Sequence, residues 1–299
     1  MEKVTHFTSR KSPWGKSHTP KRYIHPPFAE NMVTMWPNGT ILIGEIQGGA
    51  HPQHSSLARR DESNLPSAAM TLVYNNKFFD FKNAEYKTRQ DGIPIHSLVQ
   101  QSKDFTIEME SFCNTERIPT AFTKLTIYNH SGQEIRDRVG VLSRTGPEFD
   151  ILGIREPDGY AEQEPSIYRW MLLSPWNQDE KKMTDGKYSV YYQADKGVDI
   201  FTKDTFGVYF TFCLAPEEKT EIYFAFGRGE IHEDFSYEEE KSKVETFWES
   251  ELERIKVFPK KEDPKFYAMY RSLVAQGLQM FCYPQGMQYA YLRQGDSSG

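Results

Sequence analysis

Between residues 31 and 230, apolar and polar positions alternate or apolar residues form short runs, and turn residues interrupt them at short intervals. This pattern is typical of an antiparallel β-sandwich. It predicts a hairpin at 32–46 around Pro37-Asn38-Gly39 and a second at 71–81 around Asn75-Asn76, because these turn residues tolerate positive φ. Further strands are predicted at 96–101, 105–113, 121–129, 135–143, 187–194, 199–204, 206–215 and 221–229.

The periodicity changes at Ser236, where helical spacing replaces alternation. Ser236 and Glu239 form a capping box, which predicts that a helix starts here. One apolar stripe follows at helical spacing, and Pro259 ends the pattern. The residues of this stripe are Val244, Phe247, Trp248, Leu252 and Ile255. The helix is therefore amphipathic and needs a packing partner.

A second helix is predicted from Asp263-Pro264, with the Asp as N-cap and the Pro at the first helical position. Its apolar residues cover one broad face: Phe266, Met269, Tyr270, Leu273, Val274, Gly277, Leu278 and Phe281. Such a face is expected to be deeply buried among several helices, yet only one other helix is predicted. Without further helices, the side chains of Phe266, Met269, Tyr270, Leu273 and Leu278 are expected to be partly exposed. Alternatively, both helices lie back on the sandwich in an α+β fold.

Composition and charge narrow the class of protein. The chain has 299 residues, a net charge of -6 and a pI of about 5.8, which argue against binding to nucleic acid or to a membrane surface. No apolar run is long enough for a membrane helix, and the first residues lack the apolar segment of a secretory signal. We therefore expect a cytoplasmic protein.

The three cysteines, Cys113, Cys213 and Cys282, are too few and too widely spaced for a disulfide framework or a zinc site. Buried free thiols are the expected outcome. No metal site and no cofactor are predicted.

The order of these elements, with the segments FWESELERIKVFPK, DPKFYAMYRSLVAQGLQMF and RQG, resembles that of the six-hairpin glycosidases. In that family an N-terminal β-supersandwich precedes an (α/α)6 barrel, and its members include glucoamylases, cellobiose phosphorylase and glycogen-debranching enzymes. The resemblance implies a mainly β fold with an antiparallel sandwich in residues 1–235. A linker helix would occupy 236–262, and the first part of a truncated barrel would occupy 263–299.

The resemblance also implies a function. The chain would be the N-terminal part of an enzyme that acts on glycosidic bonds of an oligo- or polysaccharide, by hydrolysis or by phosphorolysis. Hydrolysis uses two carboxyl groups on either side of the bond, an acid and a base that activates water. Phosphorolysis needs only the acid, because phosphate replaces the activated water. In the resembled enzymes these carboxyl groups come from later barrel loops, so no catalytic residue is assigned here and this chain alone is expected to be inactive.

The segment after the second helix holds the predicted substrate-binding residues, Tyr291, Arg293 and Asp296. In glucoamylase-like relatives an adjacent Arg-Asp pair at this place grips sugar hydroxyls. The guanidinium of arginine donates hydrogen bonds and a carboxylate accepts them, and a sugar hydroxyl group can both accept and donate. Here the sequence is Arg-Gln-Gly-Asp, so the pair is separated; an ordinary solvated loop is the alternative.

Other carboxylates have a simpler explanation. Glu108 and Glu110 alternate with apolar residues in a strand pattern, so both are expected on the solvated face of a sheet. The run 238–243 is expected to be a charged helical face.

Two further features are candidates for binding sites. His51 and His54 form an H-x-x-H pair, but without a nearby carboxylate or cysteine a mobile surface loop is expected instead. Trp170 and Trp176 flank an apolar run and a loop, where their rings could line a sugar surface.

A second hypothesis comes from a different class. The chain would be a non-catalytic carbohydrate-binding or interaction protein, in which the two helices complete an α+β fold. The sugar, the linkage and the oligomeric state are not determined by the sequence.

Overall fold

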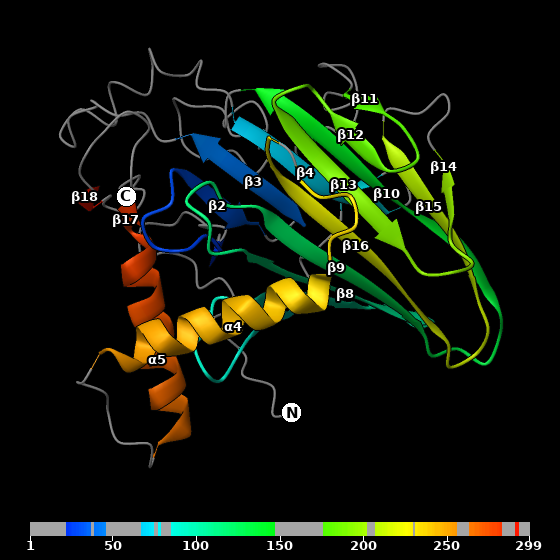
Figure 1. The fold of residues 1–299 in the computed structure, drawn as a ribbon. Helices are drawn as coiled ribbons and strands as arrows, with labels where there is room; N and C mark the ends of the chain where they lie inside the picture. Colours follow the sequence, from blue (N-terminus) through cyan, green and yellow to red (C-terminus); the bar gives the residue numbers. More distant parts are fainter. Residues whose placement is uncertain are drawn as a thin grey trace, which may run out of the picture.

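A computed structural model describes residues 22–36, 39–45, 67–74, 77–78, 85–146, 176–201, 207–229, 231–255, 263–282 and 291–292. Two antiparallel sheets face each other as a sandwich, and two helices lie at one side of it (Figure 1). The chain is thus mainly β, as the alternation predicts. No described helix is long and apolar enough to span a membrane.

In its described residues, the first sheet has the strand order β1-β2-β3-β4-β10-β15-β14, with β5 also paired to β4. Its strands are β1 (Arg22–Tyr23), β2 (Asn31–Met35), β3 (Thr40–Glu45), β4 (Ser67–Tyr74), β5 (Lys77–Phe78), β10 (Ile135–Gly146), β14 (Asp199–Phe201) and β15 (Val208–Leu214). The two predicted hairpins are confirmed, since β2 pairs with β3 and β4 pairs with β5. Gly39 adopts a φ of 74°, the left-handed value for which the turn was predicted.

The second sheet has the order β11-β12-β13-β16-β9-β8-β7-β6 in the described part. Its strands are β6 (Glu85–Thr88), β7 (His96–Gln101), β8 (Phe105–Cys113), β9 (Ala121–Asn129), β11 (Asn177–Gln178), β12 (Lys182–Thr184), β13 (Tyr188–Ala194) and β16 (Lys219–Arg228). The register pairs Glu108 with Thr126 and Glu110 with Lys124, so the even-numbered residues of β8 and β9 share the outer face.

The main core lies between the two sheets and is formed by the inward residues of their central strands. Trp176 belongs to this core: it is 6% exposed and its ring lies 6.4 Å from that of Phe226. The hypothesis that Trp176 lines a sugar surface is therefore wrong, because its ring packs inside the sandwich. Trp170, His51 and His54 lie outside the described residues.

The cysteines differ from one another. Cys113 is a buried thiol, and burial raises its pKa well above the ordinary value. The prediction of burial is wrong for Cys213, which is exposed. Alternation along β15 explains this, because Phe212 and Leu214 point into the core and Cys213 points outward. Nothing is described for the side chain of Cys282.

Helix α4 (Tyr237–Glu253) starts where the capping box predicts. The Ser236 side chain accepts a hydrogen bond from the backbone N–H of Glu239 at 3.3 Å. Val244, Trp248 and Leu252 are 0–1% exposed and form a second core with the outer face of the second sheet. The predicted apolar stripe of this helix is confirmed at these positions.

Helix α5 (Pro264–Gln279) also starts at its predicted cap, where Asp263 Oδ1 accepts from the backbone N–H of Phe266 at 3.1 Å. Its buried residues are Ala268, Ala275 and Gln279, and the partly buried Val274 and Leu278 pack beside them against the second core. A Cβ built on Gly92 would lie 2.4 Å from Arg271 Cβ, so the loop after β6 approaches the helix closely. Gly92 has a φ of 76°, which only glycine adopts without strain.

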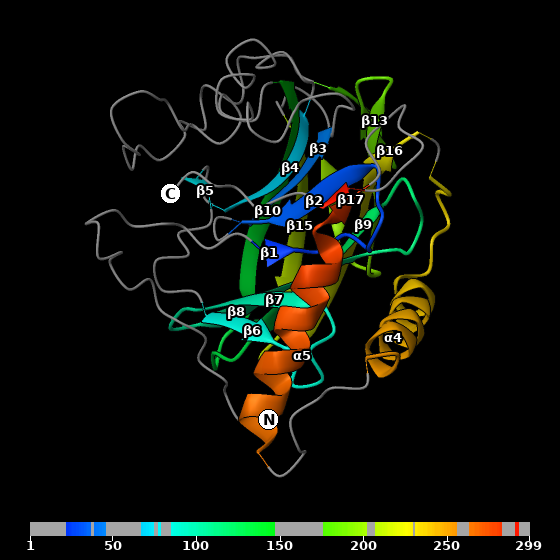
Figure 2. The same cartoon turned by 90° about the vertical axis from the view of Figure 1, so that its left-hand side faces the viewer.

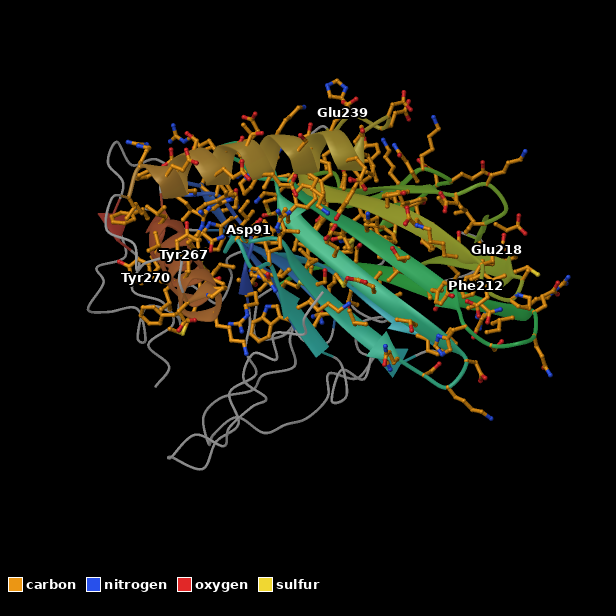
Figure 3. The ribbon with its side chains drawn as sticks, turned by 90° about the horizontal axis from the view of Figure 1, so that it is seen from below. Asp91, Phe212, Glu218, Glu239, Tyr267 and Tyr270 are labelled. Atoms are coloured by element: carbon orange, nitrogen blue, oxygen red, sulfur yellow. The ribbon has the colours of Figure 1, made fainter. Side chains whose placement is uncertain are left out.

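Three large apolar side chains of α5 point away from this packed face. Phe266 is 47% exposed, Met269 39% and Leu273 57%. Tyr270 and Leu278 are of intermediate exposure. The expected partial exposure is confirmed. The expectation of deep burial is wrong, because only Val274 and Leu278 of this broad face pack against the second core, and they are partly buried. Figure 3 shows Tyr267 and Tyr270 at the end of the molecule opposite Phe212 and Glu218.

This packing predicts that substitutions on the packed face of α5 lower the stability of the protein, whereas substitutions on its exposed face hardly change it. Ala275 is 1% exposed, so Ala275→Leu should overpack the second core and lower the free energy of unfolding by about 1–3 kcal/mol. Leu273→Lys should change it by less than about 0.5 kcal/mol, because the side chain already faces water. Urea denaturation of both variants checks this. A large loss from Leu273→Lys would contradict the described orientation of the helix.

Candidate functional site

The predicted substrate-binding segment lies where α5 ends. A short hairpin follows the helix, in which β17 (Phe281–Cys282) pairs with β18 (Tyr291–Leu292), and Cys282 lies opposite Tyr291. Tyr291 is thus placed by its backbone beside the end of α5, whereas Arg293 and Asp296 lie outside the described residues. The assignment of these three residues to a sugar site remains a prediction.

The end of α5 is attached to the edge of the sandwich by hydrogen bonds. Gln279 is 2% exposed, and its amide Nε2 donates to the carbonyl of His25 at 2.7 Å and to that of Tyr23 at 3.2 Å. The backbone N–H of Phe28 donates to the carbonyl of Phe281 at 2.7 Å. Figure 2 shows β17 beside β2 at the end of α5. Residues from both ends of the chain therefore form this edge together.

Phe28 has an unusual backbone conformation at this edge. Its φ is 61°, in the left-handed region that a bulky residue rarely adopts, and its side chain is 45% exposed. Its ring lies 6.0 Å from that of Phe281, which is 38% exposed. The conformation costs about 1–2 kcal/mol. A pair of exposed rings is thus maintained next to the hairpin despite that cost.

The turn between β8 and β9 extends the same edge. The backbone N–H of Glu30 donates to the carbonyl of Arg117 at 2.7 Å, and their side chains form an ion pair at 2.8 Å. Ile118, next in the chain, is 42% exposed. The turn between β8 and β9 therefore contacts the segment that holds Phe28. Sequence reasoning missed Phe28, Gln279 and Arg117; Pro26-Pro27, which restricts the backbone before Phe28, was the available signal.

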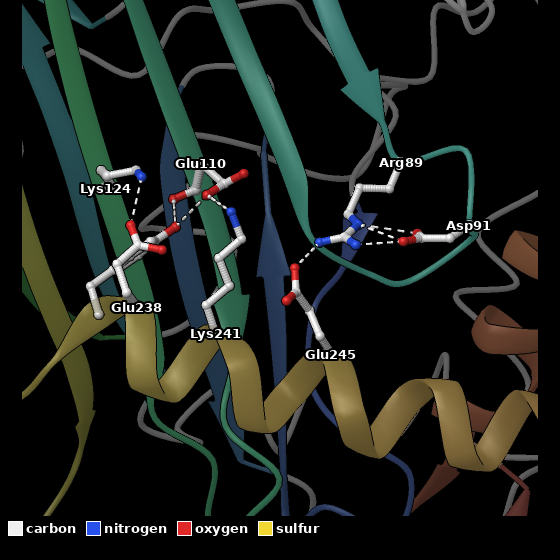
Figure 4. Close-up of polar contacts among 8 residues, drawn as sticks. Arg89, Asp91, Glu110, Lys124, Glu238, Lys241 and Glu245 are labelled. Carbon is white, nitrogen blue, oxygen red and sulfur yellow. Dashed lines mark hydrogen bonds and ion pairs between the residues drawn. The ribbon is translucent and has the colours of Figure 1, made fainter. Parts of the chain in front are cut away.

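A second polar cluster lies where α4 crosses the second sheet (Figure 4). Glu110 accepts from Lys241 Nζ at 2.7 Å and from Tyr237 Oη at 2.9 Å. The side chains of Glu110 and Lys241 are each 19% exposed. Burial, together with the charge of Glu110, raises the pKa of Tyr237 well above its ordinary value. The prediction that Glu110 is solvated is wrong, because α4 covers it; Glu108 remains partly exposed.

Lys124 of the second sheet contacts two residues at the start of α4. Lys124 Nζ pairs with Glu238 at 2.9 Å and lies 5.0 Å from the centroid of the Tyr237 ring. The run 238–243 is therefore only partly a solvated face, although Lys243 and Glu240 pair within the helix as expected. Burial alone would lower the pKa of Lys124, but the hydrogen bond to Glu238 together with the nearby glutamate charges raises it.

Arg89 joins α4 to the loop that contacts α5. Its guanidinium binds Asp91 and also Glu245 of the helix. Burial alone would lower the pKa of Arg89, but the hydrogen bonds to Asp91 and Glu245 raise it. Asp91 Oδ1 also accepts from the backbone N–H of Ile93 at 3.1 Å. These contacts therefore fix the position of the Gly92 loop, which packs closely on α5.

These clusters have the character of structural ion pairs. Glu110 and Glu245 are each bound to a cation, which leaves neither in the position of a free acid or base. Within the described ranges, no group of three or more His, Cys, Asp or Glu side chains is arranged to hold a metal ion.

Comparisons with known proteins add little. No family model and no curated protein matches the sequence. Among solved structures, the chain is similar to a kojibiose phosphorylase from the human microbiome, with a TM-score of 0.34 and 7% identity over 86% of this chain and 39% of that chain. It is also similar to a heparinase III, with a TM-score of 0.30 and 9% identity over 73% of this chain and 37% of that one. The chain spans less than half of either protein, and likeness this low carries no argument about activity.

The left-handed backbone of Phe28 gives a test of its cost. Phe28→Gly should be more stable than Phe28→Ala by about 1 kcal/mol, because glycine adopts this φ without the steric clash of a Cβ. Both variants lose the contact with Phe281, so that contribution cancels in the comparison. Chemical denaturation measures the difference. Equal stability of the two variants would mean that residue 28 is not held in the left-handed region.

The attachment of α4 is tested by two lysines of the same helix. Lys241→Met removes the partner of a largely buried carboxylate and should lower the free energy of unfolding by about 1–3 kcal/mol. Lys243→Met is the matched control, since its side chain is 66% exposed and should give no measurable change. Urea denaturation at neutral pH distinguishes them. Equal midpoints would contradict a structural role of the Glu110–Lys241 pair.

Proposed function

We propose that this chain is the N-terminal part of a carbohydrate-active enzyme that acts on glycosidic bonds. The observation that carries the proposal is the orientation of α5: Ala275, with Val274 and Leu278 beside it, packs on the second core, and Phe266, Met269 and Leu273 face outward. A helix with this pattern is suited to pack against further helices, as the first helix of an (α/α)6 barrel does. The order of a sandwich followed by two capped helices supports the same assignment.

The sandwich then has two roles. It braces the helical part through α4, which is attached to the second sheet by an apolar core and by ion pairs. It would also contribute one wall of the sugar site, where Phe28 is bonded to the hairpin after α5 and Glu30 is bonded to the 117–118 loop. On this proposal residues 1–235 are the sandwich domain, 236–262 the linker helix and 263–299 the start of the barrel.

Tyr291, Arg293 and Asp296 are proposed to contact the sugar. A guanidinium and a carboxylate bind neighbouring hydroxyl groups as donor and acceptor, and exposed aromatic rings offer an apolar face to the pyranose. Phe28 and Phe281 lie beside the backbone of this segment and are suited to the second task. The two carboxyl groups that break the bond are proposed to come from outside residues 1–299, so this chain supplies binding and positioning.

Turnover is the test of this proposal. The whole reading frame that encodes these residues should be compared with the 299-residue chain on α- and β-linked disaccharides, with and without inorganic phosphate. We expect the whole reading frame to cleave at least one of them and residues 1–299 to cleave none. Product that requires phosphate would indicate phosphorolysis, and product without it hydrolysis. Absence of turnover by both proteins would overturn the proposal.

Substitutions test the site itself in the active protein. Arg293→Ala and Asp296→Ala should each lower kcat/KM about 10- to 100-fold, the effect of losing one hydrogen bond to a charged group. The melting temperature should change little. Arg254→Ala is the matched control for the arginine, because its side chain is 74% exposed on α4. Rates equal to the control would show that the segment is an ordinary loop.

The alternative, a non-catalytic carbohydrate-binding or interaction protein, is favoured by one observation. Both helices already share a core with the second sheet, in which Trp248 and Ala275 are 1% exposed. Deletion of residues 259–299 distinguishes this alternative from the proposed enzyme fragment. If the exposed face of α5 normally packs against further helices, the deletion should reduce binding of a hydrophobic dye and hardly lower the stability of the sandwich. A marked loss of stability without dye binding by the intact chain would favour the compact α+β protein.

A further inference from the structure

The outer face of the second sheet carries a polar groove that α4 leaves open. The groove has a volume of about 570 Å³ and lies over β7, β8 and β9. Its lining includes Thr106, Glu108, Thr126, Tyr128 and His130. Because Asn129 N donates to Glu218 O at 2.9 Å, the groove lies at the Glu218 end of the sandwich (Figure 3). That end is opposite α5, so the groove is separate from the hairpin site.

Strand register gives the groove a regular floor. Thr106 is paired with Tyr128, and Glu108 with Thr126, so these four residues form a block on the same face. Directly opposed side chains in a sheet are about 5 Å apart, and the diagonal neighbours about 7–8 Å. The block therefore has the dimensions of a pyranose ring. It presents two hydroxyl groups and one carboxylate beside an aromatic ring.

Hydrogen bonds hold the two rings of the groove in place. The Tyr128 hydroxyl donates to Glu217, and His130 is fixed between the carbonyl of Lys103 at 3.1 Å and the hydroxyl of Thr106 at 3.4 Å. The ring centroids of Tyr128 and His130 lie 6.2 Å apart at 41°. Because these hydrogen bonds already fix the two rings, little conformational entropy is lost when a ligand binds against their faces.

The charges in the groove favour an uncharged ligand. Glu108 is the one carboxylate among its described lining residues, and no lysine or arginine is among them. Lys87 lies 3.7 Å from Glu108 and Lys219 2.8 Å from Glu221, so the nearby cations already face carboxylates. A phosphorylated or sulfated ligand would therefore have to compete with Glu108 for Lys87, the cation beside the groove.

We infer that this groove binds a neutral oligosaccharide, with sugar hydroxyls bonded to Glu108, Thr106 and Thr126 and a pyranose face against Tyr128. Carboxylate and hydroxyl oxygens accept from sugar hydroxyls, and the threonine hydroxyls can also donate. An amphipathic tyrosine ring covers the apolar face of a sugar. The groove is shallow and exposed, so binding should be weak, with a Kd on the order of 1 mM. The inference is independent of catalysis at the hairpin.

The experiment is an NMR titration of the isotope-labelled 299-residue chain with maltopentaose, cellopentaose and laminaripentaose up to about 10 mM. We expect at least one pentasaccharide to shift the amide signals of β8 and β9. Tyr128→Ala should weaken binding at least about 10-fold, whereas Tyr128→Phe should stay within about 3-fold, because the hydroxyl is engaged with Glu217 and the ring remains. Glu108→Gln should weaken it about 3- to 10-fold.

Matched controls locate the effect. Phe201→Ala removes an aromatic side chain that is 59% exposed on the first sheet and should leave the affinity unchanged. Arg293→Ala should also leave it unchanged, which separates this groove from the proposed site after α5. Binding of none of the three pentasaccharides would overturn the inference. So would shifts confined to the α5 hairpin, or a folded Tyr128→Ala variant with the affinity of the parent chain.

Discussion

The contact between α4 and the outer face of the second sheet determines how the rest of the molecule is arranged. Val244, Trp248 and Leu252 fill one side of this contact, and Glu110 and Lys241 close its edge. The helix extends from its cap at Ser236 towards α5, which it contacts in the same core. Since α5 then reaches the sandwich edge at Phe28, the position of the hairpin site depends on how α4 lies on the sheet.

The register of β8, β9 and β16 divides that outer face into three zones. Phe112, Phe122 and Ala225 form an apolar zone under α4. The row of Glu110 and Lys124 follows at the edge of the helix, where charges are partly buried and paired. Beyond it, Thr106 and Tyr128 face an open groove. Residues of one face, two positions apart on a strand, thus experience very different environments, although their sequence pattern is the same.

The orientation of α5 shows where pattern reasoning failed. Large apolar side chains at helical spacing normally indicate the buried face of a helix. In this chain the buried residues of α5 are Ala268 and Ala275, which allow a close approach, and Gln279, which binds two carbonyl groups of the sandwich edge. Of the predicted apolar face, Val274 and Leu278 pack on the second core, whereas Phe266, Met269 and Leu273 are exposed. The hydrophobic pattern identifies the face that buries the most area when it is covered. It does not identify which face covers the sandwich.

Local interactions explain what the sequence determined by itself. The alternation of β8 and β9, the turn at Gly39 and the caps at Ser236 and Asp263 depend on residues within a few positions of one another, and each was predicted at its observed place. The segment of Tyr291 was also predicted from a local signal, the break after α5, and its role in a sugar site remains a prediction.

Long-range contacts decided the rest. The burial of Glu110 depends on Lys241, and the exposed ring pair joins Phe28 to Phe281. The groove over Tyr128 exists because α4 crosses the sheet elsewhere. No periodicity in the sequence records which distant segment will lie on a given face. That choice is made when the whole chain packs, since only then do these side chains meet.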